Sequence, residues 1–161
     1  MDCRRKLLSL EALSAWRADQ RRRRKTVVVT NGCFDLLHAG HVTCLEAARR
    51  QGDLLLVGLN SDASVRQLKG PGRPVNSEQN RALVLAALES VGAVCIFNDL
   101  RATSFLELAQ PDVYVKGGDF TVEELPVDER RVVEAVGGRV LIMPHVPGLS
   151  TTNLLRNLGN R

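Results

Sequence analysis

Short apolar runs rich in β-branched residues alternate with helical segments along this 161-residue chain, and this alternation constrains the fold most strongly. Five runs have the length and composition of buried strands: 26–30, 53–59, 93–97, 113–116 and 139–143. Helices are predicted at 9–21, 41–50, 62–68, 78–90, 104–109, 128–136 and about 150–158. Strand alternating with helix is typical of a parallel sheet covered on both faces. We therefore predict an α/β fold, a Rossmann-like open parallel sheet with helices on both faces.

Positive charge is concentrated in the N-terminal segment. Residues 1–25 carry nine basic and three acidic side chains, whereas the remainder carries 13 basic and 15 acidic ones. We interpret 1–25 as a basic N-terminal helix or arm and 26–161 as the main domain, within a single globular domain overall. The run Arg21–Lys25 could bind nucleic acid or an anionic membrane. A solvated helix end is favoured, because no aromatic platform or nucleic-acid motif accompanies the run.

The cysteines and the hydropathy pattern bear on the cellular compartment. Cys3, Cys33, Cys44 and Cys95 show neither CxxC pairing nor zinc spacing, and free thiols fit a reducing cytosol. No apolar stretch approaches the ~18 residues that span a bilayer, and no signal-peptide pattern follows the first residue. We expect a cytoplasmic protein without a membrane partner. A nucleophilic role for Cys33 is considered, but no His/Asn partner pattern accompanies it, so a small loop residue is the favoured interpretation.

The first predicted strand runs directly into a loop that opens a helix, Asn31-Gly-Cys-Phe-Asp-Leu-Leu-His-Ala-Gly-His41. Gly32 permits close approach of backbone to a ligand, and Gly40 leaves room between two imidazoles. His38 and His41, three residues apart near a helix N-terminus, can face the same side, where the helix dipole favours an anion. Two imidazole donors there would stabilise charge developing on a phosphorus atom. The alternatives are satisfied loop histidines, or a metal site for which no third ligand is evident.

The run from Thr30 to His41 resembles the phosphate-binding signature of the cytidylyltransferase-like nucleotidyltransferases. Four further segments look like the D-glycero-β-D-manno-heptose 1-phosphate adenylyltransferases of that superfamily: 60–66, 68–75, 111–119 and 146–152. The resemblance covers about residues 7–158 and implies a fold of the nucleotidyltransferase type. That activity is often the second domain of a bifunctional kinase/adenylyltransferase. No sugar-kinase domain is present in this sequence, so it is similar to the stand-alone form.

The resemblance implies direct in-line transfer of AMP from ATP to a sugar 1-phosphate, D-glycero-D-manno-heptose 1-phosphate, which gives ADP-heptose and pyrophosphate. Catalysis would rest on positioning and charge neutralisation, without a covalent enzyme intermediate. Mg²⁺ would bridge phosphate oxygens and keep several waters, and we predict no metal ligand on the chain itself. The expected partners are the two small-molecule substrates and a second copy of the chain in a homodimer, with no nucleic acid.

Residue roles follow by resemblance. The catalytic candidates are His38 and His41, which contact the triphosphate, and Lys69, whose loop could close over the α-phosphate. Candidates for substrate binding are Arg73 and Asp35, the latter in an orienting role. The nucleotide-binding candidates are Asn31, Gly32, Cys33, Phe34, Gly40, Arg81, Lys116, Gly117, Asp119, Ser150, Thr151 and Thr152. Plainer explanations stay open for several candidates: surface cations, a glycine turn at 117–118 and a simple helix cap at 150–152.

Two other functions remain as alternatives. One is a cytidylyltransferase for glycerol 3-phosphate or a related polyol phosphate. The phosphate motifs alone cannot separate it from an adenylyltransferase, because they do not contact the base of the nucleotide. A nucleotide-sensing module is the non-enzymatic alternative. The intact pair His38 and His41 argues against a degenerate sensor.

Overall fold

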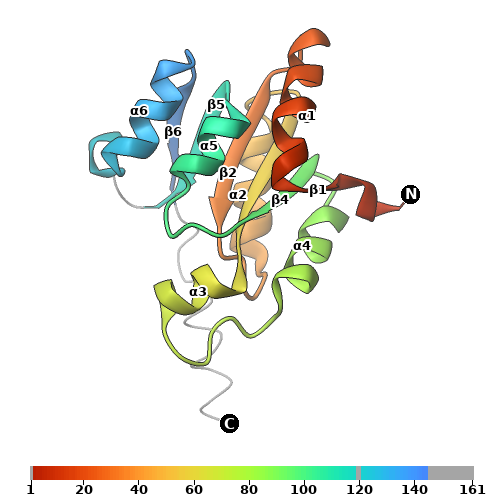
Figure 1. Ribbon diagram of the computed structural model, residues 1–161, viewed down its shortest axis with the longest axis vertical. Coiled ribbons are helices and arrows are strands. Elements are labelled where there is room, and N and C mark those ends of the chain that lie inside the picture. Colours follow the sequence, from red (N-terminus) through yellow and green to blue (C-terminus); the bar gives the residue numbers. More distant parts are fainter. Residues whose placement is uncertain (1, 119–120, 145–161) are drawn as a thin grey trace.

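The computed structural model describes residues 2–118 and 121–144, and its centre is one parallel sheet (Figure 1). Six strands lie in the order β1-β4-β3-β2-β5-β6, and every pairing is parallel. Their bounds are β1 (Leu7–Leu8), β2 (Val27–Gly32), β3 (Leu54–Asn60), β4 (Ala93–Phe97), β5 (Val113–Gly117) and β6 (Arg139–Met143). The predicted α/β fold with an open parallel sheet is confirmed.

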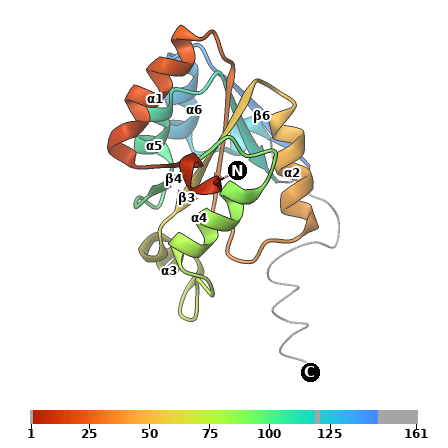
Figure 2. The same cartoon turned by 90° about the vertical axis from the view of Figure 1, so that its right-hand side faces the viewer.

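Helices cover both faces of the sheet, as Figure 2 shows from the side. One face packs against α1 (Leu10–Arg22), α5 (Thr103–Ala109) and α6 (Val127–Ala135), and the other against α2 (Ala39–Arg49) and α4 (Glu78–Ala87). Side chains of a strand alternate between faces, so Val27 and Val29 enter the first core and Val28 enters the second. Burial on both sides explains why the strands read as continuous apolar runs. The other helical segments are η1 (Cys3–Lys6), α3 (Asp62–Lys69) and η2 (Val122–Glu124).

The element boundaries differ from the predictions at several places. Helix α2 begins at Ala39, before the predicted start, with His38 as its N-cap residue. Helix α4 ends at Ala87, before the predicted end, because Leu88 adopts an extended conformation. The strand β1 was not predicted, since two residues are too short to show a periodicity. The last predicted helix, 150–158, lies outside the described residues.

The N-terminal segment packs on the same core as the rest of the chain. Strand β1 pairs with β4, and Leu13 of α1 is completely buried. Buried Arg17 donates to the carbonyl of Gln110 and, at 2.8 Å, to Oδ1 of Asp112. The other carboxylate oxygen of Asp112, Oδ2, accepts from the backbone N–H of Val27. These contacts join α1 to the starts of β2 and β5. The basic run Arg21–Arg24 is exposed at the end of the helix.

The strand order creates a switch point between β2 and β5. The chain places β3 and then β4 on one side of β2, and α5 then leads back to β5 on the other side. Ligands of open α/β sheets bind beyond the carboxyl ends of the strands at such a point. Asn31 lies near the end of β2 and Lys116 near the end of β5, so this edge is where the predicted site residues should meet. Within the described ranges, no helix is both long enough and apolar enough to cross a membrane.

Candidate active site

The two histidines of the loop after β2 lie together at the N-terminus of α2. Their rings stack with centroids 3.8 Å apart and planes 25° from parallel. The backbone N–H of His41 donates to the carbonyl of His38 at 2.9 Å, which is the first turn of the helix. The ring of Phe34 lies 5.3 Å from that of His41. The spacing of three therefore brings the imidazoles to one side, beside N–H groups that favour an anion.

Phe34 shapes the loop that precedes the histidines. Its φ of 43° is in the left-handed region, a conformation that costs a non-glycine residue about 1 kcal/mol or more. Its ring packs over Gly32, where an added Cβ would lie 3.0 Å from Phe34 Cε2. A side chain at position 32 would therefore crowd the ring of Phe34, which would have to shift to make room.

Asp35 joins the loop 70–76 to the loop after β2. Its carboxylate is buried, with 3% of the residue exposed, and it accepts from the backbone N–H groups of Val75 at 2.8 Å and Asn76 at 3.1 Å. It also pairs with the guanidinium of Arg73. Burial alone would raise the pKa of Asp35, but the N–H donors of Asn76 and Val75 and the charge of Arg73 outweigh it and hold the pKa below its ordinary value. The orienting role expected for Asp35 has this geometric basis, and Arg73 is its partner.

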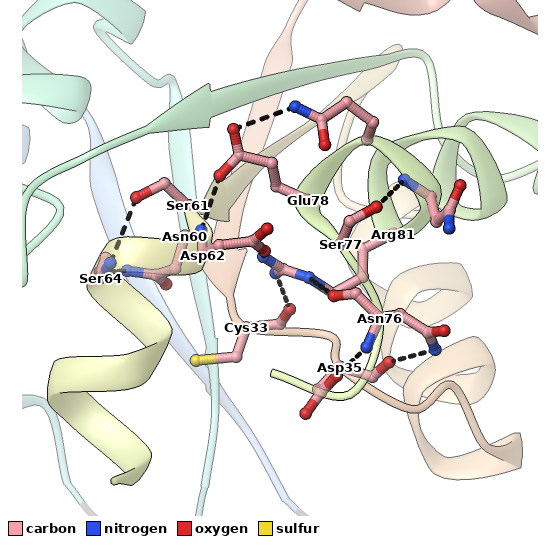
Figure 3. Close-up of polar contacts among 12 residues, drawn as sticks. Cys33, Asp35, Asn60, Ser61, Asp62, Ser64, Asn76, Ser77, Glu78 and Arg81 are labelled. Atoms are coloured by element: carbon pink, nitrogen blue, oxygen red, sulfur yellow. Dashed lines mark hydrogen bonds and ion pairs between the residues drawn. The ribbon is translucent and has the colours of Figure 1, made fainter. Parts of the chain in front are cut away.

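Arg81 connects three segments that are distant in sequence (Figure 3). Its guanidinium donates to the carbonyl of Cys33, to the carbonyl of Asn76 at 3.0 Å and to Asp62 Oδ1 at 2.8 Å. Only 2% of Arg81 is exposed, so the surface-cation interpretation is wrong for this residue. Because its fork matches three acceptors at once, Arg81 holds the loop after β2, the turn before α4 and the start of α3 in one arrangement.

Asp62 and Glu78 extend this cluster, and neither was a predicted site residue. The backbone N–H of Asp62 donates to Glu78 Oε2 at 2.6 Å, and the preceding residue, Ser61, caps α3 by accepting from the N–H of Ser64. Figure 3 shows Asp62 and Glu78 on the side of the Arg81 guanidinium that faces away from Asp35. The only signal for Asp62 in the sequence was the resemblance carried by 60–66, and Glu78 lies outside the segments that carried it. Lys69 is exposed as the last residue of α3, and Gly70 follows it at a φ of 87°.

Cys33 lies near the cations Lys69, Arg73 and Arg81, but its environment does not activate the thiol as a nucleophile. Burial raises the pKa of its thiol and outweighs the opposing charges of Lys69, Arg81 and Arg73. A raised pKa reduces the thiolate fraction on which nucleophilic attack depends. The backbone carbonyl of Cys33, which accepts from Arg81, gives this residue a structural role in the loop.

Asn31 and Lys116 meet across the switch point. The ammonium Nζ of Lys116 lies 3.0 Å from Asn31 Oδ1, and the hydroxyl of Tyr114 lies 2.7 Å from the same oxygen. Behind them, buried Glu129 of α6 contacts the Tyr114 hydroxyl at 2.9 Å and lies 3.5 Å from Lys116 Nζ. Tyr114 and Glu129 were not predicted as site residues, because each sits in an ordinary apolar or amphipathic pattern.

A small, open hollow of about 100 Å³ adjoins the loop after β2. Buried charged groups form part of its wall, and apolar side chains complete it. The lining residues are Phe34, Asp35, Leu37, Asn76, Asn80, Arg81 and Val84. In the described part of the chain, no group of three His, Cys, Asp or Glu side chains could hold a metal ion.

The remaining candidates divide into two groups. Gly40 is in the first turn of α2, and Gly117 ends β5, where an added Cβ would lie 3.4 Å from Cys44 Sγ. Asp119, Ser150, Thr151 and Thr152 lie outside the described residues. The structure therefore brings together candidates from β2, the loop after it, α4 and β5.

Comparison with known proteins gives a family match over most of the chain. The family model described as cytidylyltransferase-like matches residues 29–157. The chain is 53% identical over 142 residues to bifunctional protein HldE of Syntrophotalea carbinolica, covering 88% of this chain and 29% of that protein. It is 49% identical over 156 residues to bifunctional protein HldE of Trichlorobacter lovleyi, covering 97% of this chain and 31% of the relative. The chain thus spans less than a third of the length of these relatives.

Solved structures of distant sequence share the fold. A lipopolysaccharide core biosynthesis protein from Thermoplasma volcanium superposes with a TM-score of 0.62 at 23% identity, covering 76% of this chain and 97% of that one. Pantoate-beta-alanine ligase from Francisella tularensis superposes with a TM-score of 0.56 at 10% identity, covering 92% of this chain and 75% of the ligase chain. At these identities the likeness concerns the architecture of the sheet and its helices.

Proposed function

The chain belongs to the cytidylyltransferase-like family, and on that premise we propose that it is a nucleotidyltransferase that moves AMP from ATP to a sugar 1-phosphate. The stacked pair His38 and His41, at the N-terminus of α2 and the edge of the switch point, is the observation that carries this proposal. Imidazole and backbone N–H donors at a helix start are suited to a phosphate group that gains charge during transfer.

The reaction is a single displacement at the α-phosphorus. A phosphate oxygen of the sugar 1-phosphate forms the new bond to the α-phosphorus, the bond from that phosphorus to the bridging oxygen breaks, and pyrophosphate leaves with the electron pair. His38 and His41 stabilise the added negative charge on the α-phosphate, and no side chain forms a covalent bond to the substrate. The raised pKa of Cys33 supports a mechanism without a thiolate.

Other residues neutralise and orient the triphosphate. Lys116 supplies a cation at the end of β5, and Asn31 supplies an amide at the end of β2. We assign the same role at the α-phosphate to Lys69, which is exposed at the end of α3. Arg81, Arg73 and Asp35 act by holding the surrounding loops in place. The proposal also assigns nucleotide contacts to Asp119 and 150–152.

Mg²⁺ fits this site as a companion of the nucleotide. Asp35 carries the buried carboxylate of the loop after β2. This carboxylate pairs with Arg73 and accepts from two backbone N–H groups, so it does not serve as a ligand for a cation. A hexacoordinate ion that keeps several waters and binds phosphate oxygens needs few protein ligands. When bound, it would neutralise charge on the phosphates, while the residues named above hold and orient them.

The acceptor we propose is D-glycero-β-D-manno-heptose 1-phosphate. The resemblance through 60–75 and 111–119 supports this choice over a glycerol 3-phosphate cytidylyltransferase. The identity of about half of the residues to bifunctional protein HldE, over nearly the whole of this chain, also supports it. We further propose that the chain works as a homodimer in a reducing compartment, which suits four cysteines that are all free.

A substrate matrix tests the function. The protein is incubated with ATP or CTP and with heptose 1-phosphate or glycerol 3-phosphate, and pyrophosphate release is measured with Mg²⁺ present. Release with ATP and the heptose phosphate is the expected result. Release only with CTP and glycerol 3-phosphate would replace the proposed substrates. Nucleotide binding without release in any of the four mixtures would favour a sensing module.

A further inference from the structure

A buried carboxylate lies behind the residues that face the switch point. Glu129 is carried by α6, and 3% of it is exposed. Its Oε1 accepts from the backbone N–H of Ala102, the N-cap residue of α5, at 3.0 Å. Its Oε2 lies 2.9 Å from the Tyr114 hydroxyl and 3.5 Å from Lys116 Nζ. Since both carboxylate oxygens have partners on different elements, the group is held in one orientation.

We propose that Glu129 is a positioning residue for the nucleotide: through Lys116 and Tyr114 it holds the ammonium at the end of β5 and the amide of Asn31 ready to meet the triphosphate. This inference rests on the proposed function, because it concerns how the same site binds its nucleotide. Glu129 itself is too far inside to contact a ligand, so it acts through its neighbours.

The orientation of the Asn31 amide follows from its partner. Lys116 can only donate, so the atom of Asn31 that lies 3.0 Å from Nζ must be the carbonyl oxygen. The same oxygen faces the Tyr114 hydroxyl at 2.7 Å. The amide therefore keeps both N–H donors of Nδ2 for a ligand, and no described residue accepts from them. These donors stand at the start of the loop that leads to His38 and His41.

Lys116 is restrained in a similar way. Its side chain is 20% exposed, and its ammonium lies between Asn31 Oδ1 and Glu129 Oε2. One of its three N–H donors serves Asn31, and the charge is balanced by Glu129, which leaves donors for an anion. A free lysine side chain loses rotamer entropy when a ligand immobilises it. Restraint before binding reduces that loss and raises affinity for the nucleotide.

Tyr114 links the carboxylate to the amide. Burial, the charge of Glu129 and the hydrogen bond to it raise the pKa of Tyr114 well above its ordinary value, so the phenol keeps its proton. A hydroxyl has one proton and can donate to one acceptor at a time. Glu129 Oε2 and Asn31 Oδ1 therefore share this donor, while Lys116 donates to Asn31 Oδ1 and forms an ion pair with Glu129 at 3.5 Å.

A purely structural role would also account for a buried glutamate that caps α5, so the test must separate stability from binding. In Glu129→Gln the amide oxygen can still accept from Ala102 N–H, whereas the charge that faces Lys116 is removed. We expect the Kd for ATP, measured by calorimetry, to rise about tenfold, and KM for ATP to rise with it. We expect kcat to change less than about threefold. Glu134→Gln is the matched control on the same helix, because the Glu134 side chain is 62% exposed.

A double-mutant cycle with Lys116→Met tests the route of the effect. If Glu129 acts through Lys116, adding Glu129→Gln to Lys116→Met should change the Kd for ATP by less than about twofold. Tyr114→Phe removes only the hydroxyl, and a rise of about threefold in Kd is expected. This second variant also decides the matter if Glu129→Gln fails to fold.

The contrary outcomes are distinct. Wild-type affinity for ATP in Glu129→Gln and Tyr114→Phe, with a lowered melting temperature, would reduce Glu129 to a structural role and overturn the inference. The inference would also be overturned if Glu129→Gln raised the Kd for ATP by the same factor in the wild-type protein and in Lys116→Met. Wild-type protein that binds ATP but releases no pyrophosphate with any acceptor would refute the proposed function alone. The Kd values would still decide the role of Glu129 in that case.

Discussion

His38 and His41 stack with their ring centroids 3.8 Å apart, and the carbonyl of His38 accepts the first hydrogen bond of α2 from the N–H of His41. One residue therefore closes the helix start while both present their rings to the same side. The rings share that side with the N-terminal N–H groups of the helix, which carry partial positive charge. This arrangement gathers side-chain and backbone donors at one place.

Replacing His41 with Ala should lower kcat by at least about a hundredfold, because one donor to the developing charge is lost. The helix should remain, since its first hydrogen bond uses backbone atoms only. Pyrophosphate release and the melting temperature should be measured together. Turnover close to that of the wild type would show that the imidazole of His41 takes no part in the transfer.

Replacing Arg81 with Lys should destabilise the protein by about 2–4 kcal/mol and lower activity. An ammonium lacks the planar fork that reaches Cys33, Asn76 and Asp62 together. Urea denaturation measures the stability, and turnover is corrected for the folded fraction. Arg66→Lys, on the exposed surface of α3, is the control and should behave as the wild type. Equal effects of the two substitutions would contradict the bridging role.

Replacing Asp35 with Asn should cost on the order of 3 kcal/mol at neutral pH, because the partner charge of Arg73 then lacks its carboxylate. The pKa of Asp35 is lower in the folded protein than its ordinary value near 4, so its contribution is complete above about pH 4. That contribution is lost as the pH falls through the folded pKa. The stability gap between wild type and variant should therefore narrow in acid.

Urea denaturation at several pH values between neutral and about 3 would measure this gap. Asp99→Asn, at an exposed position, is the matched control and should show little difference at any pH. A gap that stayed constant or widened in acid would mean that Asp35 is not stabilised as a carboxylate.

Replacing Cys33 with Ser should leave kcat within about threefold of the wild type, because the contact that Cys33 makes with Arg81 comes from its backbone carbonyl. Burial raises the pKa of the thiol, so alkylation by iodoacetamide should be slower than for a free thiol near pH 7 and should accelerate as the pH rises. Mass spectrometry of the peptide that contains Cys33 follows the modification. A loss of activity of a hundredfold in Cys33→Ser would reopen the question of a nucleophile.

Replacing Gly58 with Ala should destabilise the protein by about 1–3 kcal/mol through overpacking. An added Cβ would lie 2.5 Å from Cε1 of Phe105, which packs on this strand from α5. The double variant Gly58→Ala with Phe105→Leu, which replaces the ring by a smaller side chain, should lose less free energy of unfolding than the sum of the losses in the two single variants. Strict additivity of the two would show that the substituted positions do not touch.

The amino-acid sequence by itself determined the features that depend on local patterns. The runs 26–30 and 53–59 predict buried strands because every residue of a central parallel strand faces a covered side. The positions of His38 and His41 on one side follow from helical spacing, a property of four consecutive residues. The Ser9 cap of α1 has the same local origin, and its side chain does accept from the N–H of Ala12.

The tertiary structure decided which distant residues meet. From its sequence context, Arg81 could be an exposed cation or a site residue, and only the folding of three segments around it buries it and supplies its acceptors. Glu129 and Asn31 are almost a hundred positions apart and become linked through Tyr114 because strand order places β5 beside β2. Strand order depends on packing over the whole sheet, which no local periodicity encodes. The loop that carries His38 and His41 is therefore evident in the sequence, whereas the contacts through which Arg81 and Asp35 hold it in position are evident only in the fold.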